Sequence, residues 1–219
     1  TEAGFGRHDL LINLGGGMVT DLGGFVASVY KRGLAFINVP TSLLAMVDAA
    51  VGGKTGIDFA GYKNQIGTFR AAQATYIDTG FLHTLPSQEW ANGFAELLKH
   101  ALISDAQLWQ NLSKIQDIQN ELRSETIQQG VQIKLEIVAQ DPTETGLRKI
   151  LNFGHTIGHA LESYYLNTET PLSHGHAVAI GLLLESHLSV ELSTLTKEEF
   201  LSIETQIKNT YKLQIPNDT

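Results

Sequence analysis

The chain has 219 residues, a length typical of one large domain or two modest ones, and 42% of its residues are hydrophobic against 17% charged, as in folded proteins. Its net charge of −8 argues against a broad nucleic-acid-binding surface, and no apolar run approaches the roughly 20 residues that a membrane helix needs. The absence of cysteine excludes disulfides and iron–sulfur clusters, so any metal must be bound by His, Asp or Glu. The first residues lack a signal-peptide pattern, and we expect a cytoplasmic protein.

The first third of the chain predicts an α/β arrangement. Short β-type runs cover residues 9–14, 34–39 and 74–78, and a helical stretch at 18–30 separates the first two. Strand, glycine turn, helix and strand in this order are typical of a βαβ unit with a parallel sheet. With so few strands, residues 1–85 are predicted to form a truncated Rossmann-like domain.

From Pro86 onwards the pattern becomes helical, without a further cluster of strands. We therefore expect an all-α domain over residues 86–219. Its abrupt end, like the abrupt start of the chain, indicates a fragment of a longer protein. Helical periods cover residues 90–103, 106–115, 118–140, 150–166, 176–192 and 197–211.

Two glycine-rich segments indicate anion binding. The turn at 15–21 follows a strand and opens a helix, so glycine flexibility and free helix N–H groups suit a phosphate. The segment at 51–56 ends like a nucleotide-binding P-loop, but Asp48 stands where its first glycine is required. We expect a flexible loop there that presents Lys54.

Glu96, Lys99 and His100 share one face of the helix that follows Pro86. Their neighbours are apolar, which indicates a buried helix, and a buried carboxylate needs a partner or a metal. A plain Glu–Lys pair is the alternative interpretation.

Histidine is concentrated late in the chain, where five of eight lie between residues 155 and 187. His155 and His159 are four residues apart on one predicted helix face, a spacing that suits zinc. His174 and His176 follow. The spacing leaves open whether the pair plus a third ligand, or one histidine per helix, would bind the metal. Basic residues that flank these motifs indicate a pocket for a small anion: Arg32, Lys54, Lys63, Lys99, Lys134 and Arg148.

Taken together, these motifs resemble the 3-dehydroquinate synthases, a family of sugar-phosphate cyclases. The family shares its fold with metal-dependent alcohol and glycerol dehydrogenases. The resemblance runs in order from about residue 10 to residue 190. It rests on GGGMVTDLGGFVAS, KRG, PTSLLAMVDAAVGGKTGID, GYKNQIG, TLP, NGFAELLKHA, GLRKILNFGHTIGHALE and HGHAVAIG.

The resemblance implies a carbon–oxygen lyase of the shikimate pathway, which leads to aromatic amino acids. The family converts 3-deoxy-D-arabino-heptulosonate 7-phosphate (DAHP) to 3-dehydroquinate and phosphate, by transient oxidation with NAD, phosphate elimination, reduction and aldol closure. It uses a divalent metal, zinc or cobalt, and forms homodimers. Residues 1–85 would then bind NAD, and residues 86–219 the metal and substrate.

The resemblance also implies a role for individual residues. The metal ligands would be Glu96, His155 and His174. The NAD site would comprise Gly16, Gly17, Met18, Asp21, Thr41, Ser42, Leu44, Asp48, Lys63 and Thr84. The substrate would be bound by Arg32, Asp48, Lys54, Asn64, Lys99, Lys134, Arg148, Asn152 and His159. Among these, the catalytic residues would be Lys54, Lys99, Asn152 and His159.

The chain departs from the family pattern at a few positions. Ser42 replaces a threonine but keeps the hydroxyl, Ala49 and Ala50 replace a serine pair, and His176 stands where Glu is common. The family's N-terminal strands and a C-terminal substrate lysine have no counterpart in the chain.

Substrate choice depends on Arg148 and Asn152. Helical spacing would place both on one face, which looks into the site if His155 binds the metal. Arginine can grip a carboxylate with two hydrogen bonds, which favours DAHP. Alternatively, Arg148 pairs with Glu144 or binds local backbone.

Other functions stay open at this point. One is a cyclase of the 2-deoxy-scyllo-inosose synthase type, whose substrate lacks the carboxylate. Another is a metal-dependent glycerol or alcohol dehydrogenase, which would release NADH. A third is a non-catalytic module, if the native protein lacks the family's ends.

Overall fold

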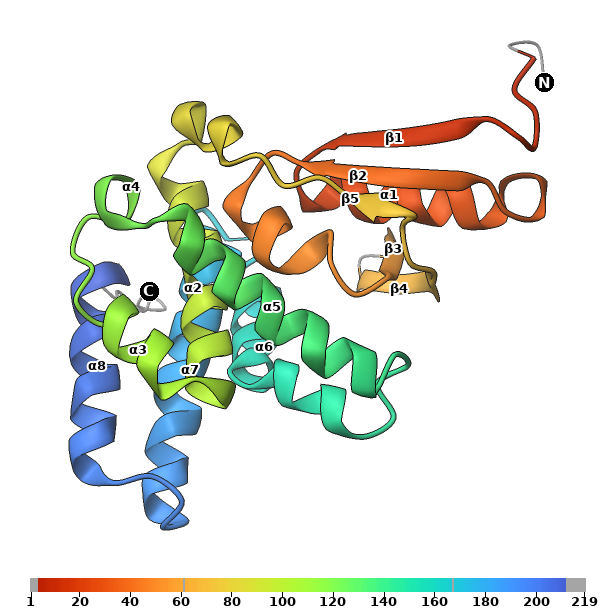
Figure 1. Ribbon diagram of the computed structural model, residues 1–219. Coiled ribbons are helices and arrows are strands. Elements are labelled where there is room, and N and C mark those ends of the chain that lie inside the picture. Colours follow the sequence, from red (N-terminus) through yellow and green to blue (C-terminus); the bar gives the residue numbers. More distant parts are fainter. Residues whose placement is uncertain (1–3, 61, 167, 212–219) are drawn as a thin grey trace. The chain divides into compact units, whose positions relative to one another are not determined.

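The computed structural model describes residues 4–60, 62–166 and 168–211, which form two compact units (Figure 1). One unit comprises the described residues up to Pro86 together with Val131–Arg148, and the other comprises Ser87–Gly130 together with the described residues from Lys149 onwards. The long helix α5 (Ser124–Gln140) therefore begins in the second unit and ends in the first.

The first unit contains the predicted parallel sheet. Strands β1 (Leu10–Gly15), β2 (Ala35–Pro40) and β5 (Ala74–Thr75) lie in the order β1-β2-β5, and helix α1 (Gly17–Val29) connects the first two. Figure 1 shows α1 along one face of the sheet. The βαβ prediction is confirmed, although the third strand is only two residues long. Apolar side chains seal the contact between helix and sheet: Leu11, Ala27, Leu34 and Phe36.

A buried polar pair joins the two long strands. Asn13 and Asn38 are register partners, and Asn13 Nδ2 donates to Asn38 Oδ1 over 2.9 Å. Asn38 Nδ2 in turn donates to the carbonyl of Ala50 over 3.2 Å. Both amides are thus satisfied inside the sheet, and they tie the loop that follows β2 to the strand ends.

The expected glycine-rich loop at 51–56 is confined to residues 51–53, where Gly52 and Gly53 have positive φ; Lys54 already begins a strand, so the expectation was wrong for residues 54–56. Strands β3 (Lys54–Phe59) and β4 (Tyr62–Phe69) form an antiparallel hairpin, in which Thr55 pairs with Thr68. β-Branched residues at 55, 57, 66 and 68 favour strands. The glycines interspersed among them conceal this pattern in the sequence.

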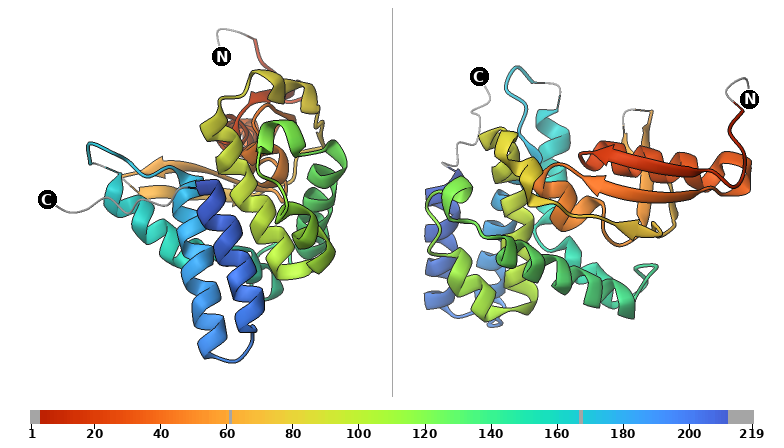
Figure 2. Two further views of the ribbon diagram at one scale, coloured as in Figure 1. Left: turned by 90° about the vertical axis from the view of Figure 1, so that its left-hand side faces the viewer. Right: turned by 45° about the horizontal axis from the view of Figure 1, so that its top comes forward.

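The second unit is helical, as predicted. Figure 2 shows α7 and α8 running side by side. The helix predicted at 197–211 is confirmed in full. Among the described residues, no helix is both long and apolar enough to cross a membrane. The helices of this unit, besides the first part of α5, are α2 (Ser87–Ser104), α3 (Ala106–Leu112), α4 (Ile118–Glu121), α6 (His155–Tyr165), α7 (His174–Glu191) and α8 (Lys197–Tyr211).

Two predicted helices are interrupted in the structure. The stretch 118–140 divides into α4 and α5, because Leu122 adopts an extended conformation. The stretch 150–166 divides into a 3₁₀ helix, Leu147–Asn152, and α6. Gly154 separates these two with φ = 77°, in the left-handed region that favours glycine.

Helices α6 and α7 approach each other at backbone distance. A Cβ atom built on Gly181 of α7 would lie 1.8 Å from the Gly154 carbonyl oxygen, so only glycine fits there. Glu185, one turn further along α7, accepts a hydrogen bond of 2.7 Å from the Gly154 N–H. The start of α6 is therefore fixed against the middle of α7.

Candidate metal and active site

The three predicted metal ligands converge in the second unit. Glu96 lies on α2, whereas His155 and His174 are the first residues of α6 and α7. His174 Nε2 lies 3.0 Å and His155 Nε2 3.3 Å from Glu96 Oε1. The three ligand atoms all lie within 4.8 Å of one another, so that one ion could contact all of them. A carboxylate with two imidazoles is a donor set that suits zinc or cobalt, and the residues fit the metal that the resemblance implies.

Helix packing places these side chains. Most of α2 is buried, including Glu96 with 0% exposure. Asn92, one turn earlier, accepts a 2.9 Å hydrogen bond at Oδ1 from the Gly175 N–H, which ties the start of α7 to α2. A Cβ atom on Gly175 would lie 2.5 Å from the Asn92 backbone, so glycine permits this approach.

The buried carboxylate of Glu96 is stabilised by surrounding positive charge. Lys99, also buried, forms an ion pair with Glu96 Oε2. Burial by itself would raise the pKa of Glu96, but Lys99 and the two imidazoles outweigh it and hold the pKa well below its usual range. Glu96 is therefore ionised, as a metal ligand must be.

Each of the two imidazoles faces an acceptor with its second nitrogen. His155 Nδ1 lies 3.2 Å from the carbonyl oxygen of Phe153, and His174 Nδ1 lies 3.6 Å from Glu162 Oε2. Burial lowers the pKa of His174, but Glu162 and Glu96 outweigh this and raise the pKa to about 10 in the metal-free protein.

His159 lies beside the three ligands. Its ring centroid is 5.0 Å from that of His155 and 6.4 Å from that of His174. Partial desolvation and the two neighbouring imidazoles lower the pKa of His159, which favours its neutral form. Asn152, predicted to contact substrate, is exposed at the end of the 3₁₀ helix.

In the first unit, the structure brings together the predicted NAD-binding turns that follow β1 and β2. The Thr41 N–H donates to the Gly15 carbonyl over 2.9 Å, and a Cβ atom on Gly16 would lie 3.4 Å from Ser42 Oγ. Met18 is 77% exposed, and α1 has no side-chain cap at its N-terminus.

Asp21 lies on α1, four residues after Gly17, and the pKa of its carboxyl group is raised. Burial raises its pKa to about 7, and the nearby carboxylates of Asp48 and Asp58 add to this, whereas Lys134 opposes it. Perturbed carboxyl groups of this kind are often found at functional sites.

The buried Lys134 and the partly buried Asp48 form a second ion pair, in the first unit. Lys134 Nζ lies 2.9 Å from Asp48 Oδ1 and donates to the Asp48 carbonyl over 2.5 Å. Lys54 forms an ion pair with Glu144, and its side chain is half exposed.

Arg148 is buried, with 1% exposure, and its guanidinium contacts backbone. Nη2 donates to the Gly52 carbonyl over 2.9 Å and Nη1 to the Pro142 carbonyl over 2.6 Å. Because residues 147–152 are a 3₁₀ helix with three residues per turn, the predicted shared helix face of Arg148 and Asn152 is wrong.

Other predicted residues lie at the surface or in loops of the first unit. Arg32 and Asn64 are exposed, and both have positive φ, 69° and 53°, which is uncommon outside glycine. Lys63 on β4 and Thr84 at the end of a 3₁₀ helix are also exposed, whereas Leu44 is half-buried before a π-helical turn.

Two acidic residues that organise the second unit were not predicted from the sequence. Glu162 and Glu185 contact His174 and the start of α6, respectively. Glu162 follows His155 by seven residues and His159 by three, and this helical spacing could have identified it.

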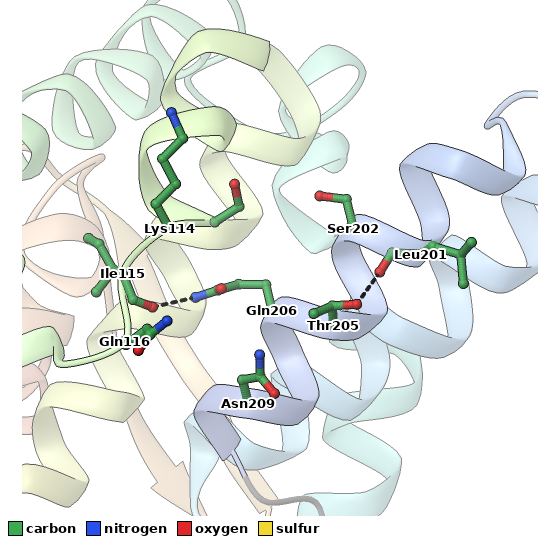
Figure 3. Close-up of a pocket in the computed structure, with 9 residues that line it drawn as sticks. Lys114, Ile115, Gln116, Leu201, Ser202, Thr205, Gln206 and Asn209 are labelled. Atoms are coloured by element: carbon green, nitrogen blue, oxygen red, sulfur yellow. Dashed lines mark hydrogen bonds between the residues drawn. The ribbon is translucent and has the colours of Figure 1, made fainter.

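A separate groove lies between the connection that follows α3 and the helix α8 (Figure 3). Gln206 crosses it and donates a hydrogen bond to the Ile115 carbonyl, drawn as a dashed line. None of the predicted site residues lines this groove.

Comparisons with known proteins show to which proteins the chain is similar. The chain is 46% identical over 213 residues to a 3-dehydroquinate synthase of Parabacteroides distasonis. The aligned region covers 96% of this chain and 60% of that protein. Among solved structures, it is similar to 2-epi-5-epi-valiolone synthase of Streptomyces hygroscopicus with NAD⁺ and Zn²⁺ bound. That match has a TM-score of 0.88 and 32% identity, and it covers 99% of this chain and 61% of the other.

A 2-deoxy-scyllo-inosose synthase, complexed with carbaglucose-6-phosphate, NAD⁺ and Co²⁺, shares the fold. It has a TM-score of 0.87 at 24% identity, over 100% of this chain and 60% of the other. The chain spans about three fifths of the length of each of these proteins.

Family models match both parts of the chain. Residues 1–92 match the N-terminal model of 3-dehydroquinate synthase, and residues 93–218 match the C-terminal model. The chain therefore belongs to the 3-dehydroquinate synthase family.

Proposed function

We propose that the protein carrying this chain is a 3-dehydroquinate synthase, which converts DAHP to 3-dehydroquinate and phosphate. The observation that carries the proposal is the convergence of Glu96, His155 and His174 in a chain that belongs to this family. The enzyme would act in the cytoplasm, as a carbon–oxygen lyase of the shikimate pathway.

Glu96, His155 and His174 would bind one divalent metal ion, zinc or cobalt. Such an ion, when bound, acts as a Lewis acid that polarises a substrate oxygen. Three protein ligands leave an open position, as in catalytic zinc sites. The ionised, fully buried Glu96 contributes the charge that compensates the cation.

The first unit would bind NAD, which accepts and returns a hydride when bound. Gly16 and Gly17 allow the cofactor to approach the backbone, and the N-terminus of α1 offers N–H groups for a pyrophosphate. The similarity to a synthase solved with NAD⁺ and Zn²⁺ supports both cofactors. Further contacts would come from Met18, Asp21, Thr41, Ser42, Leu44, Asp48, Lys63 and Thr84.

Basic and amide side chains would bind the anionic substrate. Lysine and arginine neutralise phosphate and carboxylate groups through charge-assisted hydrogen bonds. The buried Lys99 and Lys134 are held by Glu96 and Asp48, so each ammonium is fixed before substrate arrives. His159, whose neutral form is favoured, could relay a proton. The remaining contacts would come from Arg32, Lys54, Asn64, Arg148 and Asn152.

We also propose that the protein forms a homodimer. Arg32, exposed and in a left-handed conformation, would reach the substrate phosphate of the neighbouring subunit. Sedimentation of the complete protein, compared with an Arg32→Ala variant, tests the association separately from the contact. The variant should remain dimeric and lose substrate affinity.

One observation favours a second candidate, a cyclase whose substrate lacks a carboxylate. Arg148 already donates from Nη1 and Nη2 to backbone carbonyls, and these are the atoms that would otherwise bind the DAHP carboxylate.

Phosphate release tests the proposed function directly. The protein should be expressed from its complete reading frame and incubated with DAHP, with and without NAD and a chelator. We expect phosphate release that requires both cofactors, without accumulation of NADH. Accumulating NADH would instead indicate a dehydrogenase.

Two controls sharpen this measurement. His155→Ala should abolish release, whereas His187→Ala, an exposed histidine on α7, should leave it unchanged. A higher kcat/KM for glucose 6-phosphate than for DAHP would favour the second candidate. Absence of release from DAHP would contradict the proposed function.

A further inference from the structure

Glu162 is a buried carboxylate that none of the preceding roles uses. It lies on α6 with 7% exposure, and its Oε2 is 3.6 Å from His174 Nδ1. At this distance the two groups form an ion pair rather than a hydrogen bond, and the carboxylate faces the ring nitrogen that points away from Glu96. Burial of a carboxylate is costly unless a charged or donating group faces it, and His174 is one such group for Glu162.

The contact determines which nitrogen of His174 is available to an ion. When an ion displaces the proton of Nε2, an acceptor at Nδ1 would keep the remaining proton on Nδ1 and leave the Nε2 lone pair to the ion. His174 Nε2 is the atom that faces Glu96, at 3.0 Å.

His155 is arranged in the same way. Its Nδ1 faces the Phe153 carbonyl at 3.2 Å and its Nε2 faces Glu96 at 3.3 Å. Both histidines therefore have an acceptor behind the ring and the shared carboxylate in front. For His155 the acceptor is backbone, whereas for His174 it is a side chain that can be mutated.

We propose that Glu162 is a positioning residue of the metal site: it accepts a hydrogen bond from His174 Nδ1 and so fixes the tautomer and orientation in which His174 binds the ion. This inference rests on the metal site of the proposed function. Carboxylates behind ligating histidines typically contribute 10- to 100-fold in metal affinity.

The alternative is that Glu162 is itself a ligand, together with His159 and His174, whose ligand atoms also lie within 4.8 Å of one another. The geometry favours the positioning role. Glu162 approaches Nδ1 of His174, whereas the fully buried Glu96 approaches Nε2 and is shared with His155. His159, in contrast, is exposed.

Metal binding by the complete protein tests the inference. Co²⁺ is titrated into the metal-free protein and followed by its visible absorption, and Zn²⁺ affinity is measured by competition with a chromogenic chelator. The variants are Glu162→Ala and Glu162→Gln, with Glu191→Ala as a matched control, an exposed glutamate at the end of α7.

We expect one ion per chain in the wild type and in Glu191→Ala. Glu162→Ala should bind 10- to 100-fold more weakly, and Glu162→Gln, which keeps an acceptor oxygen, should recover part of the loss. The Co²⁺ spectrum at saturation should keep its coordination number, because no ligand has been removed. Glu162→Gln also serves if the alanine variant fails to fold.

Three results would overturn the inference. Equal affinity of wild type and both Glu162 variants would remove the positioning role and leave the proposed function intact. A changed coordination number in Glu162→Gln, with wild-type affinity in His155→Ala, would make Glu162 a ligand. Absence of metal binding in the wild type would remove the site itself and contradict the proposed function as well.

Discussion

Replacing Gly181 by alanine tests the packing that positions both histidines. In a helix interior this substitution normally stabilises by about 1 kcal/mol, because alanine has the higher helix propensity. Here the new Cβ atom would lie 1.8 Å from the Gly154 carbonyl oxygen and 2.7 Å from its carbonyl carbon. The expected effect is therefore the opposite of the usual one.

The magnitude follows from the distance. An ordinary contact needs about 3.4 Å, so α7 and the start of α6 must separate by more than about 1 Å. Both contact partners are backbone, and neither can rotate away. Overpacking typically costs about 1–3 kcal/mol, and the rigid partner places this case at the upper end. We expect Gly181→Ala to lower the free energy of unfolding by about 2–3 kcal/mol.

Urea unfolding followed by circular dichroism measures this change. Leu184→Ala, at a position of the same helix that is 45% exposed, is the control and should change stability by less than about 1 kcal/mol. The separation should also move His155 away from Glu96 and weaken metal binding. If Gly181→Ala were as stable as the wild type or more stable, the close approach of α6 and α7 would be refuted.

Three further predictions concern the first unit. Because the pKa of Asp21 is raised to about 7, ionisation of this carboxyl group destabilises the native state as the pH rises from about 4 to 7. Asp21→Asn should therefore raise the free energy of unfolding by roughly 2–4 kcal/mol at pH 8 and by little at pH 4. Urea titration at the two pH values measures this difference. Hydrogen bonds from the N–H groups of Gly146 and Arg148 lower the pKa of Asp141 to about 2. The ionised carboxylate therefore stabilises the native state above about pH 4, and this stabilisation is lost as the pH falls towards 2. Asp141→Asn should lower the thermal midpoint at pH 7, and the midpoints of variant and wild type should become equal in acid. A Cβ atom on Gly23 would lie 1.8 Å from Asn13 Oδ1, and Gly23→Ala should destabilise by about 1–3 kcal/mol in the same urea assay; an unchanged midpoint would contradict the close contact of α1 and β1.

The βαβ unit and the helical remainder could be predicted because their signals are local. The glycine turn at 15–17 separates a strand from a helix, and the apolar spacing in 197–211 extends over the whole of α8. The hairpin of β3 and β4 could not be predicted, because its pairing joins residues from two segments of the chain. Glycines at 56 and 67 interrupt the β-branched pattern of the two strands.

The candidate site illustrates a different limit. Periodicity could not choose among His155, His159 and His174, because helical spacing says nothing about which residue of another helix they face. That choice came from the resemblance, and the structure brings Glu96 to two of the three. Gly154 interrupts the predicted helix, so Arg148 and His155 do not lie on one continuous helix face.

The packing of α6 against α7 also has a consequence for the route of folding. The two helices are neighbours in the chain, and contacts between such neighbours form early because little loop entropy opposes them. Glu96 lies 59 positions before His155, so its carboxylate must arrive by a slower, long-range step. We therefore expect refolding to assemble the histidine pair first and to dock α2 last.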